Sequence, residues 1–148
     1  MKAFSFRLER LLRLREEAEQ QQARVMSEAA RTEADLDRLC DDQQNYVARI
    51  GDRVTPPAGQ VTNAGVLRAL HLTSAAAASQ LEDAERARAE ARKQADQERE
   101  RLADARRDRK TLERLKEHQK AAWQGEQNRD EQKTMDEIAG RPRGMPGR

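Results

Sequence analysis

The fold is decided by residues 4–50, which read FSFRLERLLRLREEAEQQQARVMSEAARTEADLDRLCDDQQNYVARI and contain neither glycine nor proline. Positions spaced alternately by four and by three residues run through the whole stretch. Ten of these 14 positions hold apolar residues, whereas only ten of the other 33 positions do. Because this alternation is the repeat of a coiled coil, it predicts one helix over residues 4–50 with a single apolar seam. The seam positions are Phe4, Leu8, Leu11, Arg15, Ala18, Gln22, Val25, Ala29, Thr32, Leu36, Leu39, Gln43, Tyr46 and Ile50.

The helical pattern stops in residues 51–63, which read GDRVTPPAGQVTN. Gly51 can take the left-handed conformation that ends many helices, and the two prolines that follow it cannot continue one. Thr62 or Asn63 can cap the helix that comes next. These residues therefore predict a turn between two helices.

A second helix is expected over residues 64–139, because glycine and proline are absent again from Val66 to Gln124 and the same alternation continues. Its seam is rich in alanine, which allows two helices to approach closely but buries little apolar area. We expect the tail, residues 140–148, to be disordered. The seam comprises Leu67, Leu70, Ala77, Leu81, Ala84, Ala91, Ala95, Leu102, Ala105 and Leu112, with polar interruptions at Ser74, Arg88, Glu98 and Arg109.

Residues 1–148 are thus predicted to form a single all-α domain, an antiparallel coiled-coil hairpin of two long helices. The short connection favours the antiparallel arrangement. Equal rise per residue places residue 4 opposite roughly residue 110. The second helix is then longer and overhangs, and it leaves apolar side chains without a partner, although residues 1–6 could wrap over one of them, Trp123. The unpaired residues are Leu115, Trp123, Met135 and Ile138.

The composition excludes several classes of function. Charged residues make up 38% of the chain and aromatic residues 3%, which suits long helices better than a globular core. The net charge is only +2, and the two signs are interleaved along most of the chain, so no one-sided basic stripe for nucleic acid is present. Both ends of the chain carry an excess of arginine, which leaves a nucleic-acid or lipid-binding adaptor open as an alternative.

No residues form a recognisable catalytic, metal or cofactor site. The chain has no glycine-rich phosphate loop, and His71 and His118 lie far apart in sequence, each without a neighbouring ligand. Cys40 is the single cysteine and follows the seam residue Leu39, so we expect a solvated free thiol in a reducing compartment. No apolar run is long enough for a membrane span, so membrane contact would be peripheral. We therefore expect a protein that is not an enzyme and acts by binding other proteins.

Three segments carry a resemblance to a known family. The N-terminal FSFRLERLLRLRE resembles the opening of the flagellar export protein FliJ family, and DRKTLERLKEHQ resembles the family's pre-terminal helix. The segment NRDEQKTMDEIAGR is similar to the family's closing pattern E-x-K-x-x-D-E. That pattern falls here on Glu131, Lys133, Asp136 and Glu137.

The resemblance implies a stalk of the flagellar type III export apparatus, located in the cytoplasm and peripherally at the cytoplasmic face of the inner membrane. Its implied partners are the hexameric export ATPase, the export-gate membrane protein and export chaperones; an injectisome stalk is the alternative machine. The ATPase-binding candidates are Phe4, Phe6, Leu8, Leu11, Leu115, Trp123, Lys133, Met135, Asp136, Glu137 and Ile138. The gate-binding candidates are Leu39, Tyr46, Val66 and Leu70.

Overall fold

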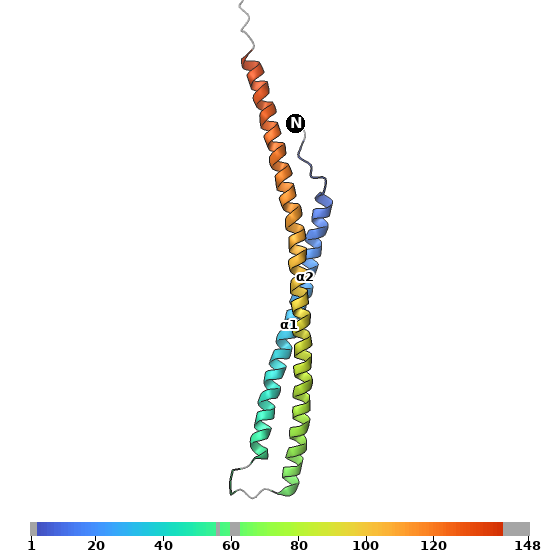
Figure 1. Ribbon diagram of the computed structural model, residues 1–148, viewed down its shortest axis with the longest axis vertical. Helices are drawn as coiled ribbons and strands as arrows, with labels where there is room; N and C mark the ends of the chain where they lie inside the picture. Colours follow the sequence, from blue (N-terminus) through green and yellow to red (C-terminus); the bar gives the residue numbers. More distant parts are fainter. Residues whose placement is uncertain (1–2, 56, 60–62, 141–148) are drawn as a thin grey trace, which may run out of the picture. The chain divides into compact units, whose positions relative to one another are not determined.

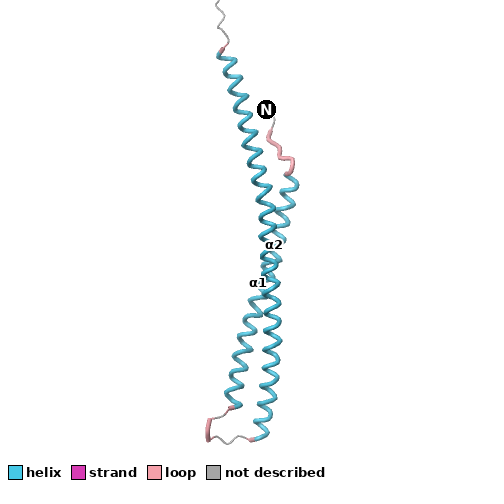
Figure 2. Tube along the Cα trace, in the orientation of Figure 1, coloured by secondary structure: helices cyan, strands magenta, loops and turns pink. Residues whose placement is uncertain are grey.

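Two long helices make up the fold. The computed structural model describes residues 3–55, 57–59 and 63–140. Helix α1 spans Glu9–Val54 and helix α2 spans Ala64–Ala139 (Figure 1). The helices pack against each other as a hairpin, α2 is the longer one, and the described residues contain no strand (Figure 2). The predicted all-α hairpin is confirmed, and α2 has the predicted bounds.

The bounds of α1 differ from the predicted range of 4–50 at both ends. The helix begins at Glu9, whose N–H donates to the carbonyl of Phe6 over 3.1 Å, and residues 3–6 are not helical. At the other end Gly51 stays helical, and the helix continues until Val54. Proline at position 56 explains this later end, because the residue before a proline is disfavoured in helical conformation.

The turn and the start of α2 follow from local chemistry. Gly59 has a φ of 102°, in the left-handed region that glycine adopts without strain. The side-chain oxygen of Asn63 accepts a hydrogen bond of 2.8 Å from the N–H of Gly65, so Asn63 is the N-cap of α2. The other candidate cap, Thr62, and all but the first residue of the predicted disordered tail lie outside the described residues.

The hairpin consists of two compact units. The terminal unit comprises Met1–Glu19 with Ala105–Arg148, and the loop unit comprises Gln20–Asp104. Within each unit a part of α1 lies beside a part of α2 (Figure 1).

The predicted seam of α2 is confirmed along its whole length. All 14 predicted positions, including the four polar ones, are buried or half-buried. Ala77, Ala84, Ala91 and Ala95 are buried in the loop unit, as is Leu102. Because alanine is small, the two backbones approach closely there, and the buried apolar area stays modest.

The predicted seam of α1 is wrong in part. Leu11, Leu39 and Tyr46 are 39%, 43% and 38% exposed, whereas the following residues Leu12 and Cys40 are buried. Cys40, expected in solvent, has no exposed surface at all. The covered stripe of α1 includes some predicted seam residues, such as Val25, Leu36 and Ile50, together with residues one position after the seam, such as Leu12, Cys40 and Val47. Because adjacent positions differ by roughly 100° of helical rotation, α2 covers the face between these two sets and leaves the other seam residues open.

Polar residues within the loop unit's seam are matched across the two helices. Glu98 is 5% exposed, and its carboxylate accepts a hydrogen bond from the amide of Gln22 on α1. The carboxylate also forms an ion pair of 2.7 Å with Arg101 of its own helix. Arg99 pairs with Glu33 at 2.8 Å. A buried carboxylate without such partners would be strongly destabilising, so these pairs define the helix register.

The terminal unit shows the same matching. Arg109 donates to Glu19 of α1 and to Glu113 of its own helix, and these hydrogen bonds raise the pKa of Arg109 above its ordinary value. Lys116 pairs with Glu9 at 2.7 Å.

The observed pairing corrects the predicted one. Phe4 lies against Trp123 rather than opposite residue 110. Two features account for the shift: the matched polar pairs select the register, and residues 3–6 are not helical. A non-helical segment can advance about 3.3 Å per residue, compared with 1.5 Å in a helix, so the N-terminus reaches further along α2.

Gln43 offers a test of the seam's packing in the loop unit. The residue is half-buried, and its Oε1 atom has no hydrogen-bond partner among the described residues. We expect Gln43→Leu to raise the free energy of unfolding by about 1–2 kcal/mol, because an unsatisfied buried acceptor is removed. Urea unfolding followed by circular dichroism measures this change. The exposed neighbour variant Gln44→Leu should change stability by less than about 0.5 kcal/mol, and equal effects of both variants would contradict the argument.

Candidate protein-interaction surfaces

The N-terminal segment is folded onto α2 in the terminal unit. The rings of Phe4 and Trp123 have centroids 5.9 Å apart and planes tilted by 51°, an aromatic contact of ordinary geometry. Phe6 is only 6% exposed. Residues at the N-terminus therefore cover part of the only tryptophan, as the sequence had allowed. Phe4 and Trp123 are brought together, and each remains half-buried rather than fully enclosed.

The uncovered part of α2 is shorter than predicted. Leu115 and Trp123 were expected there, but Lys116 still pairs with Glu9 of α1 and Trp123 still contacts Phe4. From Asn128 to Gly140 every side chain is exposed. The uncovered stretch of α2 therefore comprises residues 128–139, and we call it the C-terminal stretch.

Two large apolar side chains stand out on the C-terminal stretch. Met135 is 71% exposed and Ile138 is 66% exposed, and their spacing of three residues places them on one face of the helix. The charged candidates Lys133, Asp136 and Glu137 surround them and are exposed too. The stretch is therefore amphipathic and has no packing partner among the described residues.

The remaining candidates of the terminal unit form a partly exposed apolar group. Leu8, Leu11 and Leu115 are 37%, 39% and 39% exposed. Arg7 lies just before α1, and Arg10 lies in its first turn. Neither arginine forms an ion pair with a described residue. The terminal unit thus presents apolar side chains together with unpaired positive charge.

The candidates of the loop unit are also mostly uncovered. Leu39 and Tyr46, spaced by seven residues, belong to the stripe of α1 that α2 leaves open. Val66 is 51% exposed, and Leu70 is half-buried in the seam. Sequence reasoning missed Leu72, which is 67% exposed; its only signal was a large apolar residue outside the seam positions.

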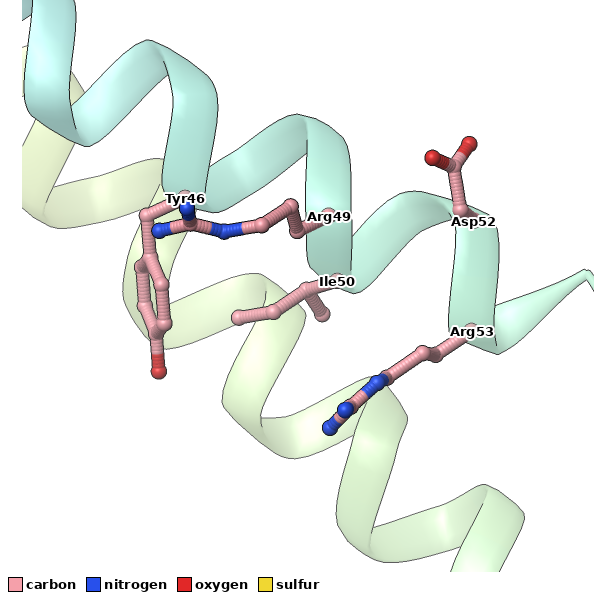
Figure 3. Close-up of a pocket in the computed structure, with 5 residues that line it drawn as sticks. All are labelled: Tyr46, Arg49, Ile50, Asp52 and Arg53. Atoms are coloured by element: carbon pink, nitrogen blue, oxygen red, sulfur yellow. The ribbon is translucent and has the colours of Figure 1, made fainter.

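A hollow of about 390 Å³ lies on α1 at the end of the same stripe. It is lined by Tyr46, Arg49, Ile50, Asp52 and Arg53. Figure 3 shows that the side chains of Tyr46, Ile50 and Arg53 extend toward one side, whereas Asp52 points away from them. Sequence reasoning missed the two arginines, although their spacing from Tyr46, by three and seven residues, is that of one helix face.

The described residues hold neither a metal site nor a membrane-spanning segment. No group of three His, Cys, Asp or Glu side chains among them is placed to hold a metal ion. Within the same residues, neither helix has a segment sufficiently long and apolar to span a membrane.

Comparison with known proteins identifies the family. The family model described as "Flagellar FliJ protein" matches residues 4–142, which is nearly the whole chain. The chain belongs to the FliJ family. No curated protein and no solved structure matches it. Membership confirms the resemblance of the two ends and makes the chain a non-catalytic structural component of the flagellar export apparatus.

The contact between Phe4 and Trp123 can be tested with the tryptophan as its own reporter, since the chain has only one. We expect Phe4→Ala to shift the Trp123 emission to longer wavelength and to increase its quenching by acrylamide, because the ring packed against the indole is removed. Leu14→Ala, at a 54% exposed position of the same unit, is the matched control and should leave the spectrum unchanged. An unaltered spectrum in Phe4→Ala would show that the N-terminal segment does not cover the indole in solution.

Proposed function

We propose that this chain is the stalk of the flagellar export ATPase, binding the hexameric ring through its terminal unit and the export-gate membrane protein through its loop unit. The proposal places it in the cytoplasm, peripherally at the inner membrane. Membership of the FliJ family supports the machine, and favours the flagellar apparatus over an injectisome. The observation that carries the choice of the ring-binding end is the C-terminal stretch, whose side chains are all exposed.

The exposed apolar residues of that stretch supply the driving force. Full burial of a side chain such as Met135 or Ile138 contributes about 1.5–3 kcal/mol relative to leaving it in water. The two side chains are 71% and 66% exposed, so about two thirds of this free energy is still available for a partner. A helix that presents spaced apolar residues on one face is suited to a groove between subunits.

The exposed positive charges of the terminal unit would guide its encounter with the ring. Arg7 and Arg10 are unpaired among the described residues, and Lys133 pairs only with Asp130, at 3.7 Å on the exposed surface. Such charges stabilise the fold little, but they accelerate encounter with an acidic surface in a manner that depends on salt. An acidic lining of the ring pore would therefore attract this end of the hairpin first.

A stalk can act on the ring only through unequal contacts. A hexamer offers six equivalent sites, whereas a single hairpin is asymmetric. Binding of the C-terminal stretch would stabilise one arrangement of subunits over the others, to the extent that its contacts differ among them. The chain would then modulate the ATPase without any chemistry of its own, and its loop unit would stay available for the gate and for export chaperones.

Ring binding should depend on the C-terminal stretch. We expect Met135→Asp and Ile138→Asp each to weaken binding to the purified export ATPase about tenfold or more, because a charge replaces a buried apolar contact. Trp123→Ala should weaken it as well, partly through loss of the Phe4 contact. Biolayer interferometry with the assembled hexamer measures the dissociation constants.

The controls for this test lie in the loop unit. Leu72→Asp makes the same kind of change at a position that is 67% exposed, and Tyr46→Ala removes the only tyrosine. Both variants should bind the ring normally. If they lose the ring while Met135→Asp keeps it, the ring-binding end has been assigned to the wrong unit.

A further inference from the structure

The hollow on α1 combines positive charge with an apolar floor. Tyr46 is 38% exposed and Ile50 only 6%, so Ile50 forms the floor and Tyr46 an accessible wall. Arg49 and Arg53 are exposed at the rim. In Figure 3 the Arg49 side chain extends along α1 toward Tyr46, and the Arg53 side chain extends past Ile50 on the same side.

The two arginines have no carboxylate partner within the part of the chain that the structure describes. Some other arginines of the loop unit are paired, such as Arg38 with Asp35 at 3.5 Å and Arg99 with Glu33. Asp52 lines the hollow within one turn of both rim arginines, yet its side chain points away. Two guanidinium groups therefore remain available beside an apolar surface.

The end of the helix explains only part of this arrangement. Arg53 lies in the last turn of α1, where a positive charge interacts favourably with the helix dipole. Arg49 lies one turn earlier, where that interaction fades, and the dipole gives no reason for an exposed aromatic ring next to it. The combination is instead typical of a binding surface, in which arginine and tyrosine are enriched.

We propose that the hollow recognises an acidic segment of a partner protein. Its carboxylates would bind Arg49 and Arg53, since the planar guanidinium group matches a carboxylate with two parallel hydrogen bonds. A neighbouring apolar side chain of the same segment would lie on Ile50 and against Tyr46. The proposal rests on the proposed contact between the loop unit and the export gate, and it names the chemistry of that contact.

The charges favour a protein segment over an anionic membrane. Lipid recognition commonly needs clusters of four to eight basic residues, whereas the hollow has two. The open stripe of α1 supports the same conclusion. Leu39 lies seven residues before Tyr46 on the same helix face, so a bound chain segment can continue from the hollow along α1.

Charge reversal tests the proposal on the full-length chain. We expect Arg49→Glu and Arg53→Glu each to weaken binding to the purified cytoplasmic region of the export gate tenfold or more, and binding of the wild type to weaken with added salt. Arg49→Lys should give a smaller loss, because lysine keeps the charge but not the paired hydrogen bonds. The matched control is Arg31→Glu, an equal change of charge at an exposed position of α1 outside the hollow. Circular dichroism verifies that each variant remains helical.

The unique aromatic residues give an independent readout. Because the chain has one tyrosine and one tryptophan, 3-fluorotyrosine and 5-fluorotryptophan each give one fluorine resonance, from the hollow and from the terminal unit respectively. The gate region should shift the Tyr46 resonance and leave that of Trp123 in place. The export ATPase should do the reverse.

The outcomes separate this proposal from the proposed function. Gate binding that is unchanged in Arg49→Glu and Arg53→Glu, or lost equally in Arg31→Glu, would overturn the role of the hollow and leave the gate contact standing. Binding to the ATPase without any binding to the gate region would overturn both the hollow and the gate contact, and would leave the ring-binding end intact. Binding of phosphatidylglycerol vesicles that depends on Arg49, with gate binding unaffected, would assign the hollow to a membrane instead.

Discussion

The matching of polar residues across the two helices is the constraint on which the rest of this structure depends. The seam of α2 consists largely of alanine, so apolar packing alone would change little if the helices slid by one heptad. Glu98 opposite Gln22, and Arg109 opposite Glu19, remove that freedom. A slid register would separate the buried Glu98 carboxylate from Gln22 and the half-buried Arg109 guanidinium from Glu19, leaving each with only the partner on its own helix, which is destabilising. The polar interruptions of the seam therefore select the alignment.

That alignment determines which surfaces remain open. It brings Phe4 into contact with Trp123. Beyond this contact, every residue of α2 from 128 to 139 is exposed. The alignment also turns one face of α1 toward α2 and leaves Leu39 and Tyr46, on the adjacent face, in solvent. Each unit thus carries its own uncovered apolar surface, as the proposed separate partners of the two units would require.

The small apolar seam between the helices also affects how the chain can function. A narrow seam of small residues is a weak source of stability, and exposed ion pairs add little to it. Charged residues make up 38% of the chain, and on the surface they keep a long helix pair from associating nonspecifically. In the proposed function, binding energy would be concentrated in the few large apolar or aromatic side chains that remain exposed.

The sequence by itself determined the two helices, the turn, the seam of α2 and the exposure of Met135 and Ile138, because these depend on local propensity and on periodicity within one helix. Tertiary structure alone decided which stripe of α1 is covered, the burial of Cys40, the cover over Trp123 and the grouping of Arg49 and Arg53 around a hollow. The physical reason is that periodicity describes a single helix. It predicted a single seam on α1, and residues next to that seam differ from it by about 100° around the axis. Only the partner helix, held in register by its polar contacts, determines which of them is buried.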